Sequence, residues 1–361
     1  MTTPRNIAIV GATGSCGRQL AVQLLDEHMM DPSARLQLVG HRGGRSESEG
    51  HGLRADLRDA FADDAPTIEL VHDPRDVDAD ILVMLAGSTI PTDPRANVDR
   101  IAIARTNHSL FQTYADEMAE RGTDAPIVIV QSNPVEVGVD SFALALDRHR
   151  VLGAGAYSDT LRFRREIADS FGVRRSHVSG YMLGQHGDHL VPAWSTVRID
   201  SLDADFVAEK LADLRAASPL LELADSIVQH RADLLGYVAR GDIHGAFERA
   251  MELPPAIRAA VKPFLVHTTA GHTTEIVTAH AVAEIIGHLL SGEDAVVPAQ
   301  VVFEGELGLY GVGGIPVRLG PGGWTEIVDP GLDDEEREAL RLALAAIDAV
   351  NSMVHAEPDD D

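Results

Sequence analysis

The sequence is poor in cysteine and in positive charge. It holds one cysteine, Cys16, in 361 residues, so an internal disulfide framework and a cysteine zinc cluster are both excluded. Lysine and arginine together number 30 against 56 aspartates and glutamates, which gives a formal net charge of −26. Because this charge repels both a phosphate backbone and an anionic membrane surface, we expect neither nucleic acid nor membrane as a partner.

Long apolar runs are also missing. No stretch of about 18 uncharged apolar residues occurs, so the sequence predicts no membrane-spanning helix. The first residues, MTTPRNIAIVGATG, show no basic region, apolar core or cleavage site typical of a signal peptide. Together with the single free thiol, these absences lead us to expect a cytoplasmic protein.

The first half of the chain alternates short apolar runs with amphipathic stretches. Near-continuous apolar runs indicate buried strands of a parallel sheet that is covered on both faces. Helical patterns lie between them, for example over 16–29 and 101–121. This alternation predicts a Rossmann-type, doubly wound α/β domain. The predicted strands are 6–10, 36–39, 81–86, 127–130 and 151–153.

The pattern changes near residue 155. We expect a dinucleotide-binding domain over 1–154, an α+β catalytic domain over 155–361, and a ligand cleft between them. The second domain is predicted to open with a helix over 158–171 that Ser158 and Asp159 cap. Later patterns predict mostly helices over 203–290 and a final helix over 333–350. Between them, runs at 296–303 and 315–319 around a glycine-rich segment predict a hairpin or meander.

Three glycines, Gly11, Gly14 and Gly17, connect the first strand to the first helix in GATGSCG. The first permits a tight turn, the second lets the backbone approach a pyrophosphate, and the third packs helix on strand. The anion would then rest on the helix N-terminus. This context predicts nucleotide binding; the alternative is a plain strand-to-helix turn, with Cys16 as a small packing residue.

Other motifs place polar side chains where chemistry is expected. A histidine, His186, stands between glycines in GQHGD, so a substrate could approach its ring. Asp159 and Arg162 are three residues apart in SDTLRFR and therefore share a helical face. Ser132 and Asn133 follow a predicted strand, and strand C-termini are where open α/β sheets bind ligands. A solvated turn histidine and a surface ion pair are the alternatives for the first two motifs.

In this order, GATGSCG, SNPV, SDTLRFR, GQHGD and GLYGVGGIPVRLG resemble the lactate/malate dehydrogenase family. The resemblance implies a malate dehydrogenase-like oxidoreductase that transfers hydride between NAD(P)H and a 2-oxo or 2-hydroxy acid, as a homodimer or homotetramer. A dehydrogenase of another 2-hydroxy acid, lactate-like or larger, and a non-catalytic nucleotide sensor are the alternatives. The related NAD-dependent glycosidases need a metal-ligating cysteine near SNPV, which is absent here.

The resemblance also implies roles for single residues. His186 matches the acid/base, Asp159 its partner, and Arg162 the clamp on the substrate carboxylate. Arg100 matches an arginine on a mobile loop that polarises the reacting carbonyl, and Asn133 matches an asparagine that orients substrate and nicotinamide. Two further positions, Ser132 and Asn107, match residues beside the cofactor.

The sequence departs from the family in two segments. The loop between Gly87 and Arg100 is longer than usual, and we expect Arg95 to contact the second carboxylate of a dicarboxylate there. The segment between His186 and Gly271 is also longer, which predicts extra helices around 203–262. The other histidines considered lack zinc spacing, so no metal is expected; they are His267, His272 and His280.

We predict NADP(H) as the cofactor, with NAD(H) as the alternative. The strand at 36–39 ends at Gly40, where NAD-binding members of this fold carry an acid. Side chains that can bind a 2′-phosphate follow it, namely His41, Arg42, Arg45 and Ser46. The alternative is a solvated arginine loop that touches no cofactor.

Overall fold

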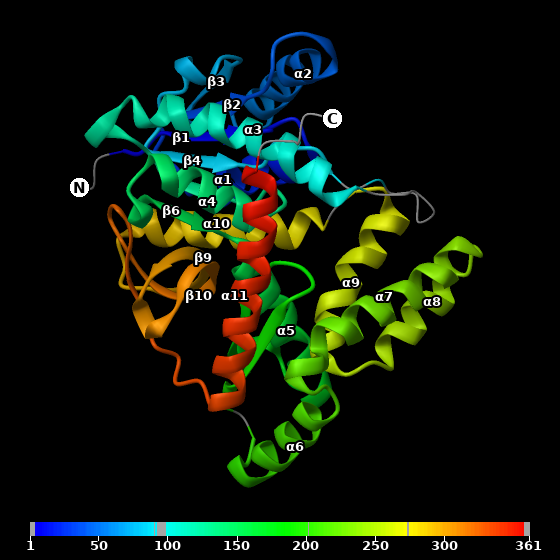
Figure 1. Cartoon of the computed structure of the whole chain (residues 1–361). Helices are drawn as coiled ribbons and strands as arrows, with labels where there is room; N and C mark the ends of the chain where they lie inside the picture. The colour runs from blue at the N-terminus through cyan, green and yellow to red at the C-terminus, as the bar shows by residue number, and fades with distance from the viewer. Residues whose placement is uncertain (1–3, 90, 92–98, 201, 273, 357–361) are drawn as a thin grey trace.

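The structure is a computed structural model that describes residues 4–89, 91, 99–200, 202–272 and 274–356 (Figure 1). One sheet of 11 strands runs through it in the order β3-β2-β1-β4-β5-β6-β9-β10-β7-β8, with β11 beside β10. The first six of these strands are parallel. They are β1 (Ile7–Val10), β2 (Arg35–Val39), β3 (Thr67–Val71), β4 (Ile81–Met84), β5 (Ile127–Val130) and β6 (Val151–Gly153).

The parallel strands follow the order expected of a Rossmann-type sheet. Alternate residues of β1 point to opposite faces, so Ile7 and Ile9 belong to one core and Ala8 and Val10 to the other. Because helices cover both faces, both sets of residues are buried, which explains the continuous apolar runs. The helices of this half are α1 (Ser15–Asp26), α2 (Gly44–Ala60), α3 (Arg100–Ala119) and α4 (Val135–Ala145).

Two elements of this half were not predicted. The apolar run of β3 is interrupted by Glu69, whose carboxylate accepts a hydrogen bond from Gln37 Nε2 of β2 at 3.1 Å. The long helix α2 buries Gly50, Leu53 and Leu57, too few for a clear apolar period. The segment after β2 is therefore a short turn followed by a helix.

The helix α5 begins at Gly155, so the prediction that Ser158 and Asp159 cap it was wrong. Ala154 is the N-cap residue, and it makes no side-chain cap. The Ser158 hydroxyl donates instead to the carbonyl oxygen of Gly155 at 2.8 Å. Both side chains are buried in the first turns of α5, where Asp159 faces the site described below.

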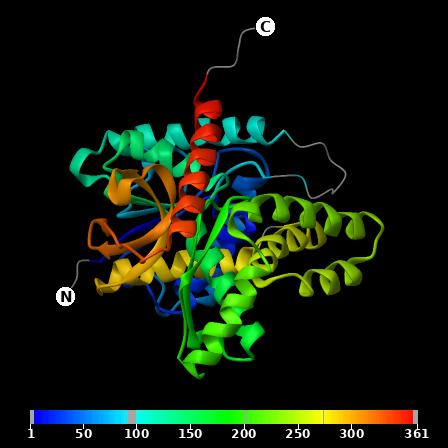
Figure 2. The same ribbon diagram turned by 60° about the horizontal axis from the view of Figure 1, so that its bottom comes forward.

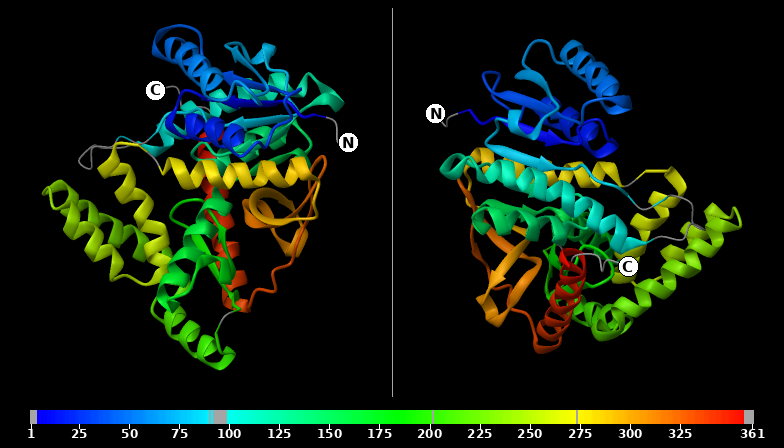
Figure 3. Two further views of the ribbon diagram at one scale, coloured as in Figure 1. Left: turned by 180° about the vertical axis from the view of Figure 1, so that it is seen from behind. Right: turned by 45° about the horizontal axis from the view of Figure 1, so that its top comes forward.

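The second half adds antiparallel strands to the edge of the parallel sheet. Gly153 of β6 pairs with Gln300 of β9, which joins the two halves. β9 and β10 form the predicted hairpin, and α10 packs along α1 (Figure 3). The elements are α5 (Gly155–Phe171), β7 (Val178–Gly184), β8 (Leu190–Ile199), α10 (Glu275–Ser291), β9 (Val296–Glu304), β10 (Tyr310–Gly320), β11 (Gly323–Ile327) and α11 (Asp334–His355).

Between β8 and α10, the described residues form four α-helices and one short 3-10 helix. Two of them, α7 and α8, project from the body of the molecule beside α9 (Figures 1 and 2). These helices are α6 (Ala204–Ala216), α7 (Leu223–Ala239), α8 (Ile243–Met251) and α9 (Pro255–Ala270). No helix in the described part of the chain is long and apolar enough to cross a membrane.

Candidate active site

Three of the predicted side chains meet beside the C-terminal end of β7. His186 follows this strand, and its Nδ1 lies 2.7 Å from Oδ2 of Asp159 on α5. Arg162, almost one turn further along α5, donates from Nη1 to Oδ1 of Asp159 at 2.7 Å. The carboxylate is thus bonded on both oxygens. Such an arrangement fixes the orientation of an imidazole and stabilises its charged form.

Burial and charge act in opposite directions on this pair. Burial disfavours the charged imidazole, but the Asp159 carboxylate outweighs it and raises the pKa of His186. Burial also disfavours the charged carboxylate, but His186 and Arg162 outweigh it and lower the pKa of Asp159. The pair therefore remains an imidazolium–carboxylate over a wider pH range than the free groups would.

Groups from other elements hold His186 in place. The backbone N–H of His186 donates to Oε1 of Glu136, in the first turn of α4, at 2.6 Å. A Cβ on Gly155 would lie 2.7 Å from Cγ of His186, so this glycine makes room for the ring. Gln300 of β9 accepts from the N–H of Ala156 at 3.0 Å. We did not predict Glu136 and Gln300, because no local spacing connects them to partners 50 and 144 residues away.

The arginines of the site come from three helices. Arg162 donates from Nη2 to Oγ1 of Thr274 at 2.7 Å. Arg100 is the first residue of α3, and its Nη1 lies 3.2 Å from Oδ2 of Asp188. Arg231 on α7 pairs with the same carboxylate. We did not predict Arg231, because the sequence gives a helical pattern for its segment and no partner.

The polar residues after β4 and β5 hold the strand ends together. Asn107 is buried, and its Nδ2 donates to the carbonyl oxygens of Ser88 and Asn133 at 2.9 and 2.7 Å. Ser132 Oγ contacts two carbonyl oxygens at the end of β4, at 3.1 and 2.6 Å. The Asn133 side chain is exposed at this edge of the sheet. Arg95 lies outside the described residues.

The glycine loop has the geometry that a dinucleotide needs. Gly11 has a φ of +85°, and a Cβ on it would lie 2.8 Å from the backbone nitrogen of Ala86. A Cβ on Gly17 would lie 2.4 Å from the carbonyl oxygen of Gly11. The Gly14 N–H donates to that same oxygen at 3.0 Å, and α1 starts at Ser15. The close turn and the helix N-terminus therefore fit the pyrophosphate of a nicotinamide dinucleotide.

At the end of β2, a side chain on Gly40 would have to displace the hydroxyl of Ser46. A Cβ there would lie 2.9 Å from Oγ of Ser46, which is itself 3.3 Å from Oγ1 of Thr13 in the glycine loop. Ser46 thus lies between the glycine loop and the end of β2. The predicted side chains of His41 and Arg42 are exposed in the turn after β2.

The first turn of α2 also carries acidic groups. Arg45 is 91% exposed and pairs with Glu49 on the same helix. Oε2 of Glu47 accepts a hydrogen bond from the N–H of Gly43 at 2.8 Å. Arg45 therefore already has a carboxylate partner on its own helix, and the backbone N–H of Gly43 already donates to Glu47.

Comparisons with known proteins match the chain to one enzyme family. A family model described as lactate/malate dehydrogenase, NAD binding domain, matches residues 5–153, and one described as the alpha/beta C-terminal domain of the same family matches residues 264–356. Malate dehydrogenase of Halobacterium salinarum is 27% identical over 347 residues, which cover 95% of this chain and 97% of the relative. L-lactate dehydrogenase 2 of Enterococcus faecalis is 25% identical over 360 residues, covering 98% of each chain.

Solved structures share the fold. The lactate dehydrogenase of Cryptosporidium parvum, complexed with lactic acid and nicotinamide adenine dinucleotide, matches with a TM-score of 0.76 at 22% identity, covering 99% of this chain and 100% of that chain. The malate dehydrogenase of the same organism matches with a TM-score of 0.74 at 18% identity, covering 98% and 99%.

The fold and the site define an oxidoreductase that transfers hydride between a nicotinamide cofactor and a 2-hydroxy or 2-oxo acid. Both halves of the chain match models of one family, and the curated relatives match along nearly all of it. The chain belongs to the lactate/malate dehydrogenase family.

Proposed function

We propose that this protein is a malate dehydrogenase-like enzyme in which His186 exchanges the proton and Arg162 binds the substrate carboxylate. The observation that carries the proposal is the 2.7 Å contact between His186 Nδ1 and Asp159 Oδ2. Because Nδ1 is engaged there, Nε2 is the atom left to exchange a proton with a substrate oxygen. The planar fork of Arg162 suits a carboxylate, and its contact with Thr274 fixes its orientation.

In the reductive direction, negative charge develops on the oxygen of the 2-oxo group. The bound nicotinamide cofactor supplies the hydride. His186 donates the proton, and Asp159 stabilises the imidazolium before the transfer and keeps the ring oriented after it. Arg100 contributes a positive charge near the oxygen when it leaves Asp188. The exposed Asn133, at the sheet edge, orients substrate and nicotinamide. Oxidation of the hydroxy acid reverses these steps.

NADP(H) is the cofactor that we favour, with the glycine loop and the ends of β4 and β5 forming its binding site. The absence of an acid at Gly40 and the nearby Arg42 support this preference, because a 2′-phosphate needs positive charge and tolerates no adjacent carboxylate. The carboxylate of Glu47, in the first turn of α2, opposes this preference because it would repel a 2′-phosphate. Steady-state kcat/KM for NADPH and NADH decides between the cofactors: a higher value with NADPH supports the proposal, and equal or better use of NADH rejects it.

A dicarboxylate such as oxaloacetate or malate is the substrate class that we favour. Arg95 is the residue proposed to bind the second carboxylate. The alternative substrate is another 2-hydroxy acid, lactate-like or larger. Initial rates with oxaloacetate, pyruvate and larger 2-oxo acids test the choice. The ratio of oxaloacetate to pyruvate activity is expected to fall in Arg95→Gln, and an unchanged ratio excludes Arg95 from substrate selection.

The functional division of the chain follows from these roles. Residues 1–154 form the dinucleotide-binding domain and residues 155–361 the catalytic domain, with α6 to α9 as an elaboration of the latter. The family model for the first domain ends at residue 153, which supports this boundary. A homodimer or homotetramer is the expected assembly. Light scattering on the purified protein measures its mass, and a monomer would contradict this expectation.

A further inference from the structure

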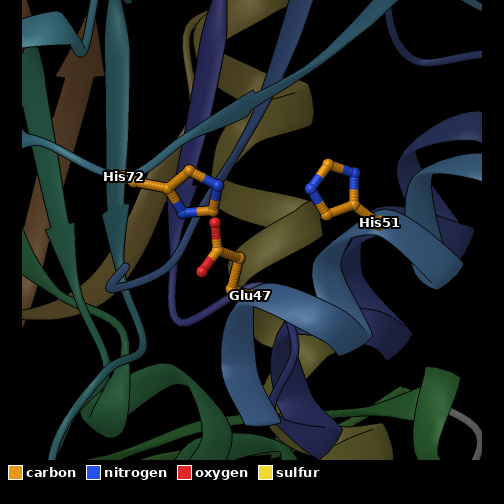
Figure 4. Close-up of side chains that lie close together, drawn as sticks. All are labelled: Glu47, His51 and His72. Carbon is orange, nitrogen blue, oxygen red and sulfur yellow. The ribbon is translucent and has the colours of Figure 1, made fainter. Parts of the chain in front are cut away.

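Three side chains with metal-binding chemistry meet at the edge of the nucleotide-binding half. Glu47 and His51 are four residues apart on α2 and therefore share a helical face. His72 directly follows β3, the edge strand of the sheet. One possible ligand atom of each residue lies within 4.8 Å of those of the other two (Figure 4). The expectation of no metal was drawn from histidines elsewhere, because no sequence spacing connects His72 to α2.

Two of these side chains are oriented by the backbone as metal ligands commonly are. The Nδ1 atom of His72 lies 3.2 Å from the carbonyl oxygen of Gly40. When Nδ1 donates its proton there, Nε2 is left with the lone pair that a metal needs. Oε2 of Glu47 accepts from the N–H of Gly43 at 2.8 Å, which leaves Oε1 as a ligand. The backbone of one turn therefore holds a ligand from each of the two elements.

We propose that Glu47, His51 and His72 bind one divalent transition-metal ion such as Zn²⁺. Two imidazoles and one carboxylate suit zinc, which leaves a fourth position for water. Mg²⁺ and Ca²⁺ prefer sets made entirely of oxygen. The ion would join α2 to the end of β3 and would add to the burial of Gly50, Leu53 and Leu57, which holds this helix against the sheet. None of its ligands belongs to the hydride-transfer site, but the backbone groups that orient two of them lie in the turn after β2 that is proposed to bind the cofactor.

The test is titration of the chelator-treated, full-length protein with ZnCl₂ in a calorimeter, and with CoCl₂ while the visible absorption of Co²⁺ is recorded. We expect one ion per chain, a Co²⁺ spectrum of low coordination number, and a higher Tm with Zn²⁺. His51→Ala with His72→Ala should weaken binding at least about 10-fold, and Glu47→Gln should act in the same direction. The control His244→Ala, an exposed histidine on α8, should bind as the wild type does.

Absence of saturable Zn²⁺ binding would overturn the proposal. So would equal affinity in the wild type and the double histidine variant, since the bound ions would then be held by the many acidic groups of the surface. Binding of MgCl₂ that matches that of ZnCl₂ would exclude the ligand set proposed here. Circular dichroism of the variants is the folding control. If each variant is folded, a loss of binding reports on the ligands themselves.

A separate observation concerns the extra helices. Arg231 on α7 contacts both carboxylate oxygens of Asp188, with Nη2 3.2 Å from Oδ2. Its side chain is 11% exposed, and its guanidinium lies 4.6 Å from the ring centre of Phe264 on α9. Asp188 is two residues from His186, and it also contacts Arg100. A helix of the additional segment thus reaches the hydride-transfer site.

The two arginines Arg100 and Arg231 share the carboxylate of Asp188, and this sharing affects whether Arg100 can move to the substrate. Arg100 is half exposed and shares one oxygen of Asp188, whereas Arg231 is largely shielded from solvent and contacts both oxygens. If Arg100 turns to a substrate carbonyl, Asp188 keeps its partner only because Arg231 is present. Without Arg231, Asp188 would have Arg100 as its remaining arginine partner, so it would hold Arg100 back, and its uncompensated charge would repel the substrate carboxylate whenever Arg100 left.

We infer that Arg231 is a positioning residue, which neutralises Asp188 so that Arg100 is free to approach the substrate. This inference rests on the proposed function, because it assumes that Arg100 polarises the carbonyl. It assigns to the additional helices a part in the reaction that the sequence did not predict.

A double-variant cycle tests this role. Arg231→Met keeps the apolar stem over Phe264, and it should lower kcat and raise KM for the 2-oxo acid, together reducing kcat/KM at least about 10-fold. Asp188→Asn in the same chain removes the unpaired charge and should restore most of the loss. Arg249→Met, at a partly exposed arginine of α8 that pairs with Glu252, is the matched control and should leave both constants unchanged.

The possible results distinguish a failure of the positioning role of Arg231 from a failure of the proposed function. If Arg231→Met behaves as the wild type, or if the double variant is as impaired as Arg231→Met, the positioning role is wrong while the proposed function stands. A purely structural role for Arg231 predicts the second of these results. If the wild type reduces no 2-oxo acid, the proposed function fails, and this inference fails with it.

Discussion

Replacing Asp159 by asparagine removes one charge from the buried pair and keeps the shape of the side chain. The largest interactions that raise the pKa of His186 against the effect of burial are the charge of Asp159 and its 2.7 Å hydrogen bond, with a smaller effect from the charge of Glu136. Without the charge, burial dominates, and the pKa of His186 should fall. The imidazole would then lose its proton at a lower pH, and its orientation would be held by a weaker, neutral hydrogen bond.

The size of the effect follows from the bond that is lost. A hydrogen bond to a charged group contributes about 1.5–3 kcal/mol, and about 1.4 kcal/mol corresponds to a tenfold change in rate. We therefore expect kcat for reduction to fall about 10- to 100-fold in Asp159→Asn, with the affinity for the cofactor nearly unchanged. Near-normal turnover would contradict the reasoning.

The pH profile gives a second readout of the same change. Reduction needs the imidazolium, so its rate should decline as pH rises through the pKa of His186, which lies above the ordinary 6.5 in the wild type. In Asp159→Asn this decline should move to lower pH. A decline at the same pH in both proteins would show that the Asp159 charge does not control the proton donor.

Three further variants test other parts of the structure. His186→Ala should lower kcat about 100-fold or more in steady-state assays, and normal turnover would remove it from the mechanism. Arg162→Lys should lose much of kcat/KM for any 2-oxo acid, since lysine cannot form the bidentate contact; an unchanged value would reject the clamp. Glu336→Ala should lower the free energy of unfolding in urea by about 2 kcal/mol or more, because the buried Glu336 carboxylate accepts from the Ser195 and Asp333 N–H groups. An equally stable variant would contradict that reading of the helix cap.

Much of the parallel half could be predicted because its signals are local. The runs at 127–130 and 151–153 coincide with β5 and β6, since strands covered on both faces are apolar at every position. β3 and α2 could not be predicted in this way. Glu69 in β3 is stabilised by Gln37 across the sheet, and α2 buries few side chains, so neither element has a clear apolar pattern.

In the candidate site, too, contacts between residues close in sequence could be predicted, and contacts between distant residues could not. Asp159 and Arg162 lie near each other because helical spacing brings them together, and that spacing is visible in the sequence. The start of α5 was misplaced because Ser158 and Asp159 are typical cap residues, whereas here their side chains bond inside the protein. Arg231 contacts Asp188 across 43 residues, and such a contact is set by the packing of α7 rather than by any local pattern.

The central claim is that His186 transfers a proton during hydride transfer to a 2-oxo acid. The most direct measurement is the rate at which reduced nicotinamide is consumed when a 2-oxo acid is added, compared between the wild type and His186→Ala. We expect consumption to depend on both the acid and the enzyme, and to be about 100-fold or more slower in the variant with cofactor binding retained. If the wild type consumed neither NADPH nor NADH with oxaloacetate, pyruvate or larger 2-oxo acids, His186 would not be the proton donor of such a reaction.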